Sequence, residues 1–126
     1  MLYIYIYYTG NFMILTIRKN KFKVKTLFTE KDKSDGMMFR DFDGSFDGLL
    51  FLYDLDEHCF LMKNCLIRLD IIFIKNHNIY KIFHDCPICV SEFCKKYCSL
   101  GDSVLELKGG TCESLGLREG DKILFD

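Results

Sequence analysis

Four cysteines in a short stretch carry the clearest chemical signal in this chain. Cys86 and Cys89 enclose a proline and an isoleucine, and Cys94 and Cys98 follow soon after. Four thiolates can form the tetrahedral shell that structural zinc prefers, and the first pair has the spacing of many zinc sites. The second pair follows almost at once, whereas structural zinc sites usually place a longer loop between their pairs. We therefore favour reduced thiols; zinc is the less favoured alternative, and the sequence identifies no other cofactor.

The number of cysteines and the residues around them indicate the cellular compartment and the reactivity of the thiols. The chain has 7 cysteines, so they cannot all pair within one molecule. We find no export signal, and a reducing, cytoplasmic location is the simpler expectation. Redox catalysis would need Cys86 at a helix N-terminus, where the helix dipole lowers the pKa of a thiol. The flanking residues show no strand leading into such a helix, so redox catalysis is not favoured.

The composition is that of one globular domain. A chain of 126 residues with 49% hydrophobic and 28% charged residues can bury a substantial core. Its formal net charge of −1 gives no overall attraction to nucleic acid or acidic membranes. Lysines alternate from position 19 to position 25, which more often marks the solvated face of a hairpin than a track for phosphates. We expect no nucleic-acid partner, and the sequence specifies no protein partner.

The first residues stand apart from the rest of the chain. The segment from Met1 to Tyr8 is apolar but far shorter than the roughly 20 residues that span a bilayer, so we expect no transmembrane segment. Its alternation of aliphatic residues with tyrosines fits an added edge strand. Met13 would start a cleaner domain. We therefore treat residues 1–12 as an N-terminal extension and residues 13–126 as a single domain.

The first half of the chain predicts a hairpin, a short helix and buried strands. Residues 14–28 alternate as strand, turn and strand, with the turn at 19–21. Thr29 is a good N-cap for a helix, and Gly36 can end it with a positive φ. The further elements expected here are a helix over 30–35 and strands over 48–53 and 59–62, separated by an acidic turn at 54–57.

The second half predicts a second hairpin and a C-terminal module. Asparagines at a tight turn join apolar runs at 69–75 and 79–83. Residues 84–103 lose all periodicity and predict a long ordered loop. A strand from Val104, a helical turn capped by Thr111 and stopped by Gly116, and a strand over 122–125 should follow. The expected fold is mostly β, a compact barrel or sandwich with helices near residues 30 and 113.

Five motifs occur in a fixed order: Gly36-Met37-Met38-Phe39-Arg40, Gly48-Leu49-Leu50-Phe51, Met62-Lys63-Asn64, Leu69-Asp70-Ile71-Ile72-Phe73-Ile74, and the tail from Val104 to Phe125. Each motif is weak alone, but together they are specific. Over about residues 14–126 the chain resembles domain-of-unknown-function family 192, also called uncharacterised protein family 0127. The resemblance implies a small, mostly β, barrel-like or sandwich domain with short helices, and it implies no agreed activity.

The chain departs from the pattern of that family at several positions. Leu61 stands where the resemblance implies an aromatic residue, commonly tryptophan, and Cys65 and Arg68 replace the more usual threonine and proline. Many relatives look exported, a location that we do not carry over. Some carry cysteines near Cys89 and Cys94 that would pair as a disulfide in an exported protein. The resemblance thus keeps a disulfide open as an alternative to reduced thiols.

Polar residues within these motifs are the candidate ligand-binding site: Arg40, Lys63, Asn64 and Asp70. Charged groups beside a core are costly unless they are paired, so they form either an internal network or a pocket for a small polar or anionic ligand. We favour pairing of Arg40 with Asp70. The leading function is a small, non-enzymatic binding or accessory domain. The alternative is an enzyme acting on a small anionic or sugar-like substrate, held by Arg40 and Lys63, with Asp70 as general base.

Overall fold

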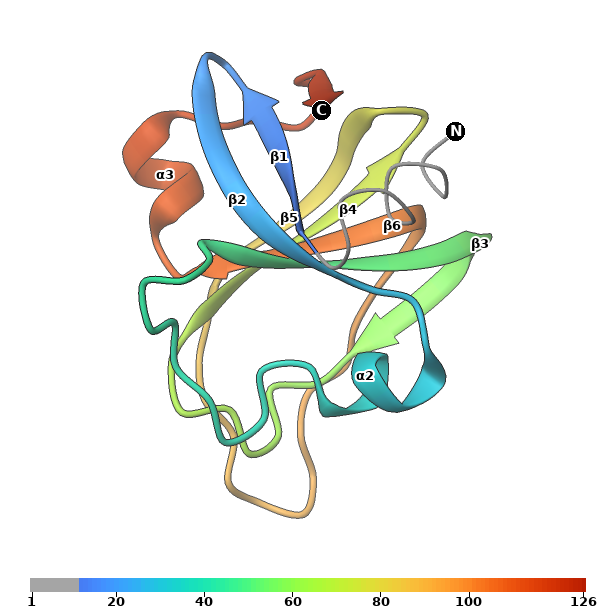
Figure 1. Ribbon diagram of the computed structural model, residues 1–126. Coiled ribbons are helices and arrows are strands. Elements are labelled where there is room, and N and C mark those ends of the chain that lie inside the picture. Colours follow the sequence, from blue (N-terminus) through green and yellow to red (C-terminus); the bar gives the residue numbers. More distant parts are fainter. Residues whose placement is uncertain (1–11) are drawn as a thin grey trace.

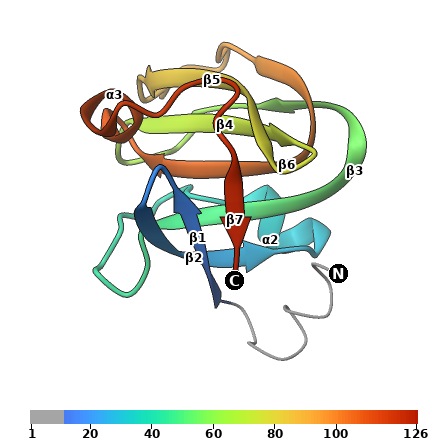
Figure 2. The ribbon, with the colours of Figure 1, turned by 90° about the horizontal axis from the view of Figure 1, so that it is seen from above.

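The structure is a computed structural model that describes residues 12–126, so the expectation for residues 1–11 lies outside the described part. Seven strands form one sheet in the order β5-β4-β6-β3-β2-β1-β7, and the sheet curls strongly (Figures 1 and 2). The predicted mostly β domain with two short helices is confirmed. The elements are β1 (Phe12–Ile17), β2 (Asn20–Leu27), α2 (Glu30–Asp35), β3 (Gly48–Phe60), β4 (Leu69–Lys75), β5 (Asn78–Cys86), β6 (Tyr97–Lys108), α3 (Thr111–Leu115) and β7 (Ile123–Phe125).

The two ends of the sheet meet through the segment that leads into β7. The amide of Ile79 on edge strand β5 donates to the carbonyl of Asp121 at 2.8 Å, and the amide of Ile123 donates to the carbonyl of His77 at 2.7 Å. The amide of Ile82, further along β5, donates to Oε2 of Glu119 at 3.1 Å. These bonds occupy edge groups of β5 that could otherwise pair with another chain.

The central strands bury both faces of the sheet. Side chains alternate between the faces of a strand, yet consecutive positions are all buried over 48–52 of β3, 69–74 of β4 and 103–107 of β6. One core cluster, inside the curl, contains Leu50, Ile72 and Leu105. The other, on the opposite face, contains Phe51 and Val104. The continuous apolar runs of the sequence therefore correspond to strands covered on both sides.

Two tight hairpins set the register of their strands. Arg18 and Lys19 have φ values of 48° and 67°, and Asn76 and His77 have φ values of 51° and 63°, as two-residue turns of this type require. The second turn lies where it was predicted. The first turn is one residue earlier than the predicted 19–21, because Ile17 pairs with Asn20. Asn20 holds the turn through its side chain, which donates to the carbonyl of Arg18 at 3.0 Å.

The sequence analysis placed the boundaries of one strand and one loop wrongly. The predicted strands 48–53 and 59–62 are one strand, β3, whose register with β6 shifts between Leu52 and Asp56. This irregularity absorbs the acidic stretch that looked like a turn. The predicted loop 84–103 shrinks to 87–96, because β5 and β6 extend into it from both sides. Pairing of β6 with β3 extends the strand despite its weak periodicity.

Helix α2 begins and ends as predicted. The hydroxyl of Thr29 accepts a hydrogen bond from the amide of Asp32 at 3.1 Å, and Gly36 ends the helix with a φ of 44°. The segment after Gly36 lies at the lower end of the molecule in Figure 1, with the loops that precede β4 and β6. Within residues 12–126 there is no helix long and apolar enough to cross a membrane.

Candidate functional site

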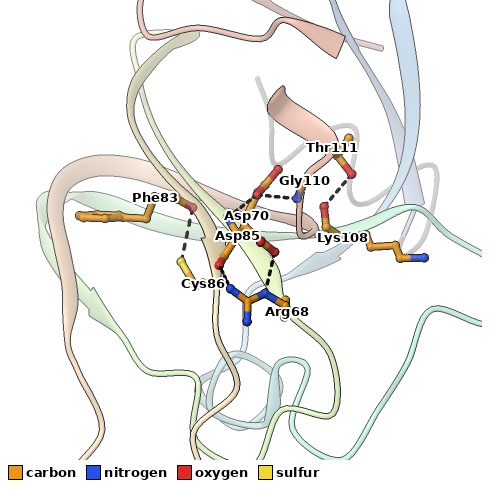
Figure 3. A network of polar contacts seen from close by, with 8 residues as sticks. All are labelled: Arg68, Asp70, Phe83, Asp85, Cys86, Lys108, Gly110 and Thr111. Carbon is orange, nitrogen blue, oxygen red and sulfur yellow. Dashed lines mark hydrogen bonds and ion pairs between the residues drawn. The ribbon is translucent and has the colours of Figure 1, made fainter. Parts of the chain in front are cut away.

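The carboxylate of Asp70 is held at the N-terminus of α3 (Figure 3). Asp70 is fully buried. Its Oδ1 accepts hydrogen bonds from the amides of Asp85 at 2.8 Å and Gly110 at 3.1 Å, and its Oδ2 accepts one from the amide of Cys112 at 2.8 Å. Three backbone donors satisfy the buried charge and cap the helix.

This arrangement corrects two expectations. Asp70 forms no ion pair with Arg40; the guanidinium of Arg40 lies instead over the ring of Phe46, with its Cζ 5.5 Å from the ring centroid. Thr111 is not the N-cap of α3. Gly110 occupies that position without a side-chain cap, and the hydroxyl of Thr111 donates to the carbonyl of Lys108 at 2.6 Å. The cap comes from a strand distant in sequence, which local pattern cannot reveal.

Arg68 and Asp85 extend this network toward the surface (Figure 3). Nε of Arg68 donates to Oδ1 of Asp85 at 2.9 Å, and its terminal nitrogen donates to the carbonyl of the same residue at 3.0 Å. Both side chains are about half exposed, so the pair contributes little beyond fixing the turn into β4. The hydrogen bonds to Asp70 therefore join β4, β5 and the start of α3, and the carboxylate that accepts them is fully buried.

The other predicted site residues separate in space. Asn64 adopts a φ of 59°, and its carbonyl accepts from the amide of Phe39 at 2.8 Å, so it joins two loops. Lys63 is exposed and lines a cavity described below. Of the four candidates, only Lys63 lines that cavity.

The candidate zinc cysteines are not brought together either. Cys89 pairs with Cys94 in a disulfide, as the family resemblance implied, and Cys98 pairs with Cys59, which lies directly opposite it in the β3–β6 register. Cys86 is buried, and its thiol donates to the carbonyl of Phe83 at 3.4 Å. Among residues 12–126 no three potential metal ligands from histidine, cysteine and acidic side chains are grouped. The reduced-thiol expectation for Cys89, Cys94 and Cys98 is thus corrected.

A cavity of about 410 Å³ lies between α2, β3 and the loop before β4. Its walls are mainly apolar, with a few ionisable groups. Leu61, where the family resemblance implies an aromatic residue, is one of the lining residues. The side chains that matter below are Glu30, Lys33, Asp35, Met37, Phe51, Tyr53, Phe60, Leu61, Lys63, Cys65 and Glu106.

Glu106 places a carboxyl in the wall of this cavity. It is 4% exposed, and its Oε1 has no hydrogen-bond partner among the described residues. On the sheet it stands opposite Leu49 of β3 and Ile71 of β4, both fully buried, so it occupies a core position. Burial raises the pKa of Glu106 to about 8. At neutral pH it is largely a protonated acid that can donate or accept a hydrogen bond.

Two further groups of the cavity keep their protons. Burial, and secondarily the charge of Glu106, raise the pKa of Tyr53 to about 12 and that of the Cys65 thiol to about 11. Both side chains are therefore neutral at physiological pH. A neutral thiol is a weak nucleophile, so Cys65 acts here as part of the wall.

The ammonium of Lys33, at the rim of the cavity, already has partners within the protein. It donates to the carbonyl of Leu52 at 3.0 Å and lies 4.2 Å from the centroid of the Tyr53 ring. Glu30 approaches the same ammonium at 3.5 Å. These contacts hold the end of α2 against β3 and leave Glu106 without a cationic partner.

Sequence reasoning missed Glu106, although a signal was present. A single acid interrupts the apolar run Val104-Leu105-Glu106-Leu107, at the start of a predicted strand. An ionisable residue at such a position is costly unless it is paired, and so marks either an internal network or a site.

The profile of DUF192, described as "Uncharacterized ACR", matches residues 13–125. The chain belongs to the DUF192 family. No curated protein sequence matches this DUF192 domain.

Two solved structures resemble the DUF192 domain described here. One is a protein from Sinorhizobium meliloti 1021 that has been proposed to be a transcription regulator, with 25% identity, a TM-score of 0.78, and coverage of 90% of this chain and 92% of that chain. The other is a protein of unknown function from Novosphingobium aromaticivorans, with 27% identity, a TM-score of 0.74, and coverage of 90% and 83%.

Proposed function

We propose that this DUF192 domain is a small, non-enzymatic binding domain that takes a small polar ligand into the Glu106 cavity. The observation that carries the proposal is the unpartnered Oε1 of a carboxyl that is 4% exposed and lines a cavity of about 410 Å³. A buried polar atom without a partner costs free energy, and a ligand group that bonds to it recovers that cost. Apolar walls with few polar groups are typical of small-molecule sites.

The enzymatic alternative loses the base that the sequence proposed for it. Both oxygens of Asp70 already accept hydrogen bonds from backbone amides, and Asp70 does not line the cavity. A general base must lie within hydrogen-bond reach of the substrate, and Asp70 is fully buried outside this cavity. We therefore propose binding without turnover.

The Sinorhizobium meliloti relative suggests a different partner. Transfer of its proposed regulatory role to this chain would call for nucleic-acid contact, most simply along the exposed lysines 19, 21 and 23 of the first hairpin. The net charge of −1 argues against this, and we expect no binding. Fluorescence anisotropy with a labelled random DNA duplex at low salt tests it, and affinity that falls steeply with salt would contradict the expectation.

The binding proposal can be tested with a tryptophan reporter, since the chain contains no tryptophan. The Leu61→Trp variant places an indole at the cavity wall, and Leu66→Trp is its control, because Leu66 is similarly exposed but does not line the cavity. We expect saturable changes in the emission of Leu61→Trp when small amines, carboxylates and polyols are titrated, with constant emission from Leu66→Trp. No response in either variant, or equal responses in both, would refute the site.

A further inference from the structure

The charges around the cavity pair among themselves, with two exceptions. Glu30 lies 3.5 Å from the ammonium of Lys33, and Asp35 lies 3.0 Å from that of Lys31. The remaining ionisable residues of the lining are Lys63, which is exposed, and Glu106, which is buried. Neither forms an ion pair within the described part of the chain. The deep group that needs a partner is thus an acid, and the unpaired cation stands in solvent.

The surroundings of Glu106 suit a cation better than an anion. The rings of Phe51 and Phe60 line the same cavity and meet edge to face, with their centroids 4.8 Å apart. The ring of Tyr53 also lines the cavity, but the ammonium of Lys33 and the ring of His58 already lie against it. Aromatic rings attract cations through their negative faces. A carboxylate and an ammonium form a charge-assisted hydrogen bond, which strengthens where water is excluded.

We propose that the buried end of the ligand is an organic ammonium group, bound by the carboxylate of Glu106 among the aromatic rings of the cavity wall. This inference rests on the proposed function and deepens it, because it names the chemical class of the ligand. The proposed ligand is thus cationic, whereas the sequence analysis had suggested an anionic ligand near Lys63. Lys63 then stands at the entrance as a like charge that weakens binding.

The binding step releases a proton. In the free protein at neutral pH the carboxyl of Glu106 is largely protonated, because burial raises its pKa. An incoming ammonium keeps its own proton, Glu106 gives up its proton to the solvent, and a carboxylate–ammonium pair forms. Tyr53 and Cys65 stay protonated, because burial raises the pKa of both. The other ionisable groups of the lining are Glu30, Lys33, Asp35 and Lys63. Up to one proton therefore leaves for each ligand bound.

The test compares three probes of similar shape by calorimetry at pH 7: 2-phenylethylammonium, 2-phenylethanol and 3-phenylpropanoate. We expect the ammonium to bind at least about tenfold more tightly than either other probe. Titrations in phosphate and in MOPS, which differ in ionisation enthalpy and contain no primary ammonium, should report release of a proton on binding. A lysine side chain of a partner protein carries the same group, so Nα-acetyl-lysine N-methylamide is included; tighter binding of this probe would point to a protein as the source.

Variants separate the two ends of the site. Glu106→Gln should weaken ammonium binding at least about tenfold and abolish proton release, whereas Lys63→Gln should strengthen it. Glu57→Gln, an exposed change on β3 away from the cavity lining, is the matched control and should leave affinity unaltered. If Glu106→Gln does not fold, proton release by the unmodified protein still decides the question.

Contrary outcomes are distinguishable. Tighter binding of 3-phenylpropanoate that is lost in Lys63→Gln would overturn the ammonium class and leave the binding function standing. Equal binding of the alcohol and the ammonium without proton release would also overturn the ammonium class and leave the binding function standing. Failure of all probes to bind at millimolar concentration would overturn the ammonium proposal, and the tryptophan reporter would then decide separately whether any ligand enters the cavity.

Discussion

Asp70 and Glu106 are buried carboxyls on neighbouring strands that leave the sheet on opposite faces. Glu106 of β6 pairs with Ile71 of β4, one position beyond Asp70, and successive side chains of a strand alternate between faces. Asp70 faces α3 and accepts three amide hydrogen bonds, whereas Oε1 of Glu106 faces the other core without a partner. The first carboxyl therefore stabilises the fold, whereas the second keeps an oxygen without a hydrogen-bond partner among the described residues.

Removal of the Asp70 carboxylate should be among the most damaging single changes. Asp70→Ala leaves the buried amide of Cys112 and the part-buried amides of Asp85 and Gly110 without their acceptor, and we expect a loss of at least about 3 kcal/mol in the free energy of unfolding. Denaturant titration measures it. Asp54→Ala, at an exposed aspartate of β3, is the control and should change stability by less than about 0.5 kcal/mol. Equal effects would show that the amide bonds to Asp70 contribute little.

Stability should fall with rising pH because of Glu106. Its pKa is raised by burial from 4.5 to about 8, so between these values the folded state holds a proton that the unfolded state has lost. The free energy of unfolding then decreases by up to about 1.4 kcal/mol per pH unit, and the loss is complete above the folded-state pKa. Glu106→Gln cannot titrate and should lack this component. Parallel profiles of the two proteins from pH 5 to pH 9 would contradict the assignment.

The glycine that ends α3 should resist substitution for a backbone reason alone. Gly116 has a φ of 70°, and an added Cβ would meet nothing within 4 Å. Gly116→Val should cost about 1–3 kcal/mol, whereas Gly116→Asn, which tolerates this conformation, should cost less. Thermal or denaturant unfolding measures both. A Val variant as stable as the Asn variant would contradict the prediction.

Glu119 is exposed but is not a neutral control for this substitution, because its Oε2 accepts the hydrogen bond from the edge amide of Ile82. Glu113, exposed in α3, serves that purpose instead. Glu113→Ala should change stability by no more than about 0.5 kcal/mol.

The disulfide pattern can be counted chemically. In protein purified without reductant and then denatured, a maleimide should modify three thiols, those of Cys65, Cys86 and Cys112, and all 7 cysteines after reduction. Cys98→Ser should add one reactive thiol, because it frees Cys59, whereas Cys86→Ser should remove one. Mass spectrometry gives the counts. Seven reactive thiols before reduction would show that neither disulfide forms.

The local elements of this protein were predictable from its sequence. Helix α2 begins after Thr29 and ends at Gly36, because capping and positive φ depend on neighbouring residues. The Asn76-His77 turn follows from the tolerance of asparagine for positive φ. Gly116 and the buried Leu117 follow the same local logic at the end of α3. These features depend on interactions between residues close together in the chain, so they can be predicted from the sequence.

Only the tertiary structure decided the partners of the charged and sulfur-bearing side chains. Asp70 caps a helix 40 or more positions away along the chain, and Cys59 meets Cys98 across 39 positions through strand register. The cavity arises because α2, β3 and the loop before β4 converge on the face of β6 that carries Glu106. Such pairings depend on how strands align and which face each residue takes. A single acid in an apolar run signals a buried charge, but only packing shows which carboxyl is satisfied and which faces a cavity.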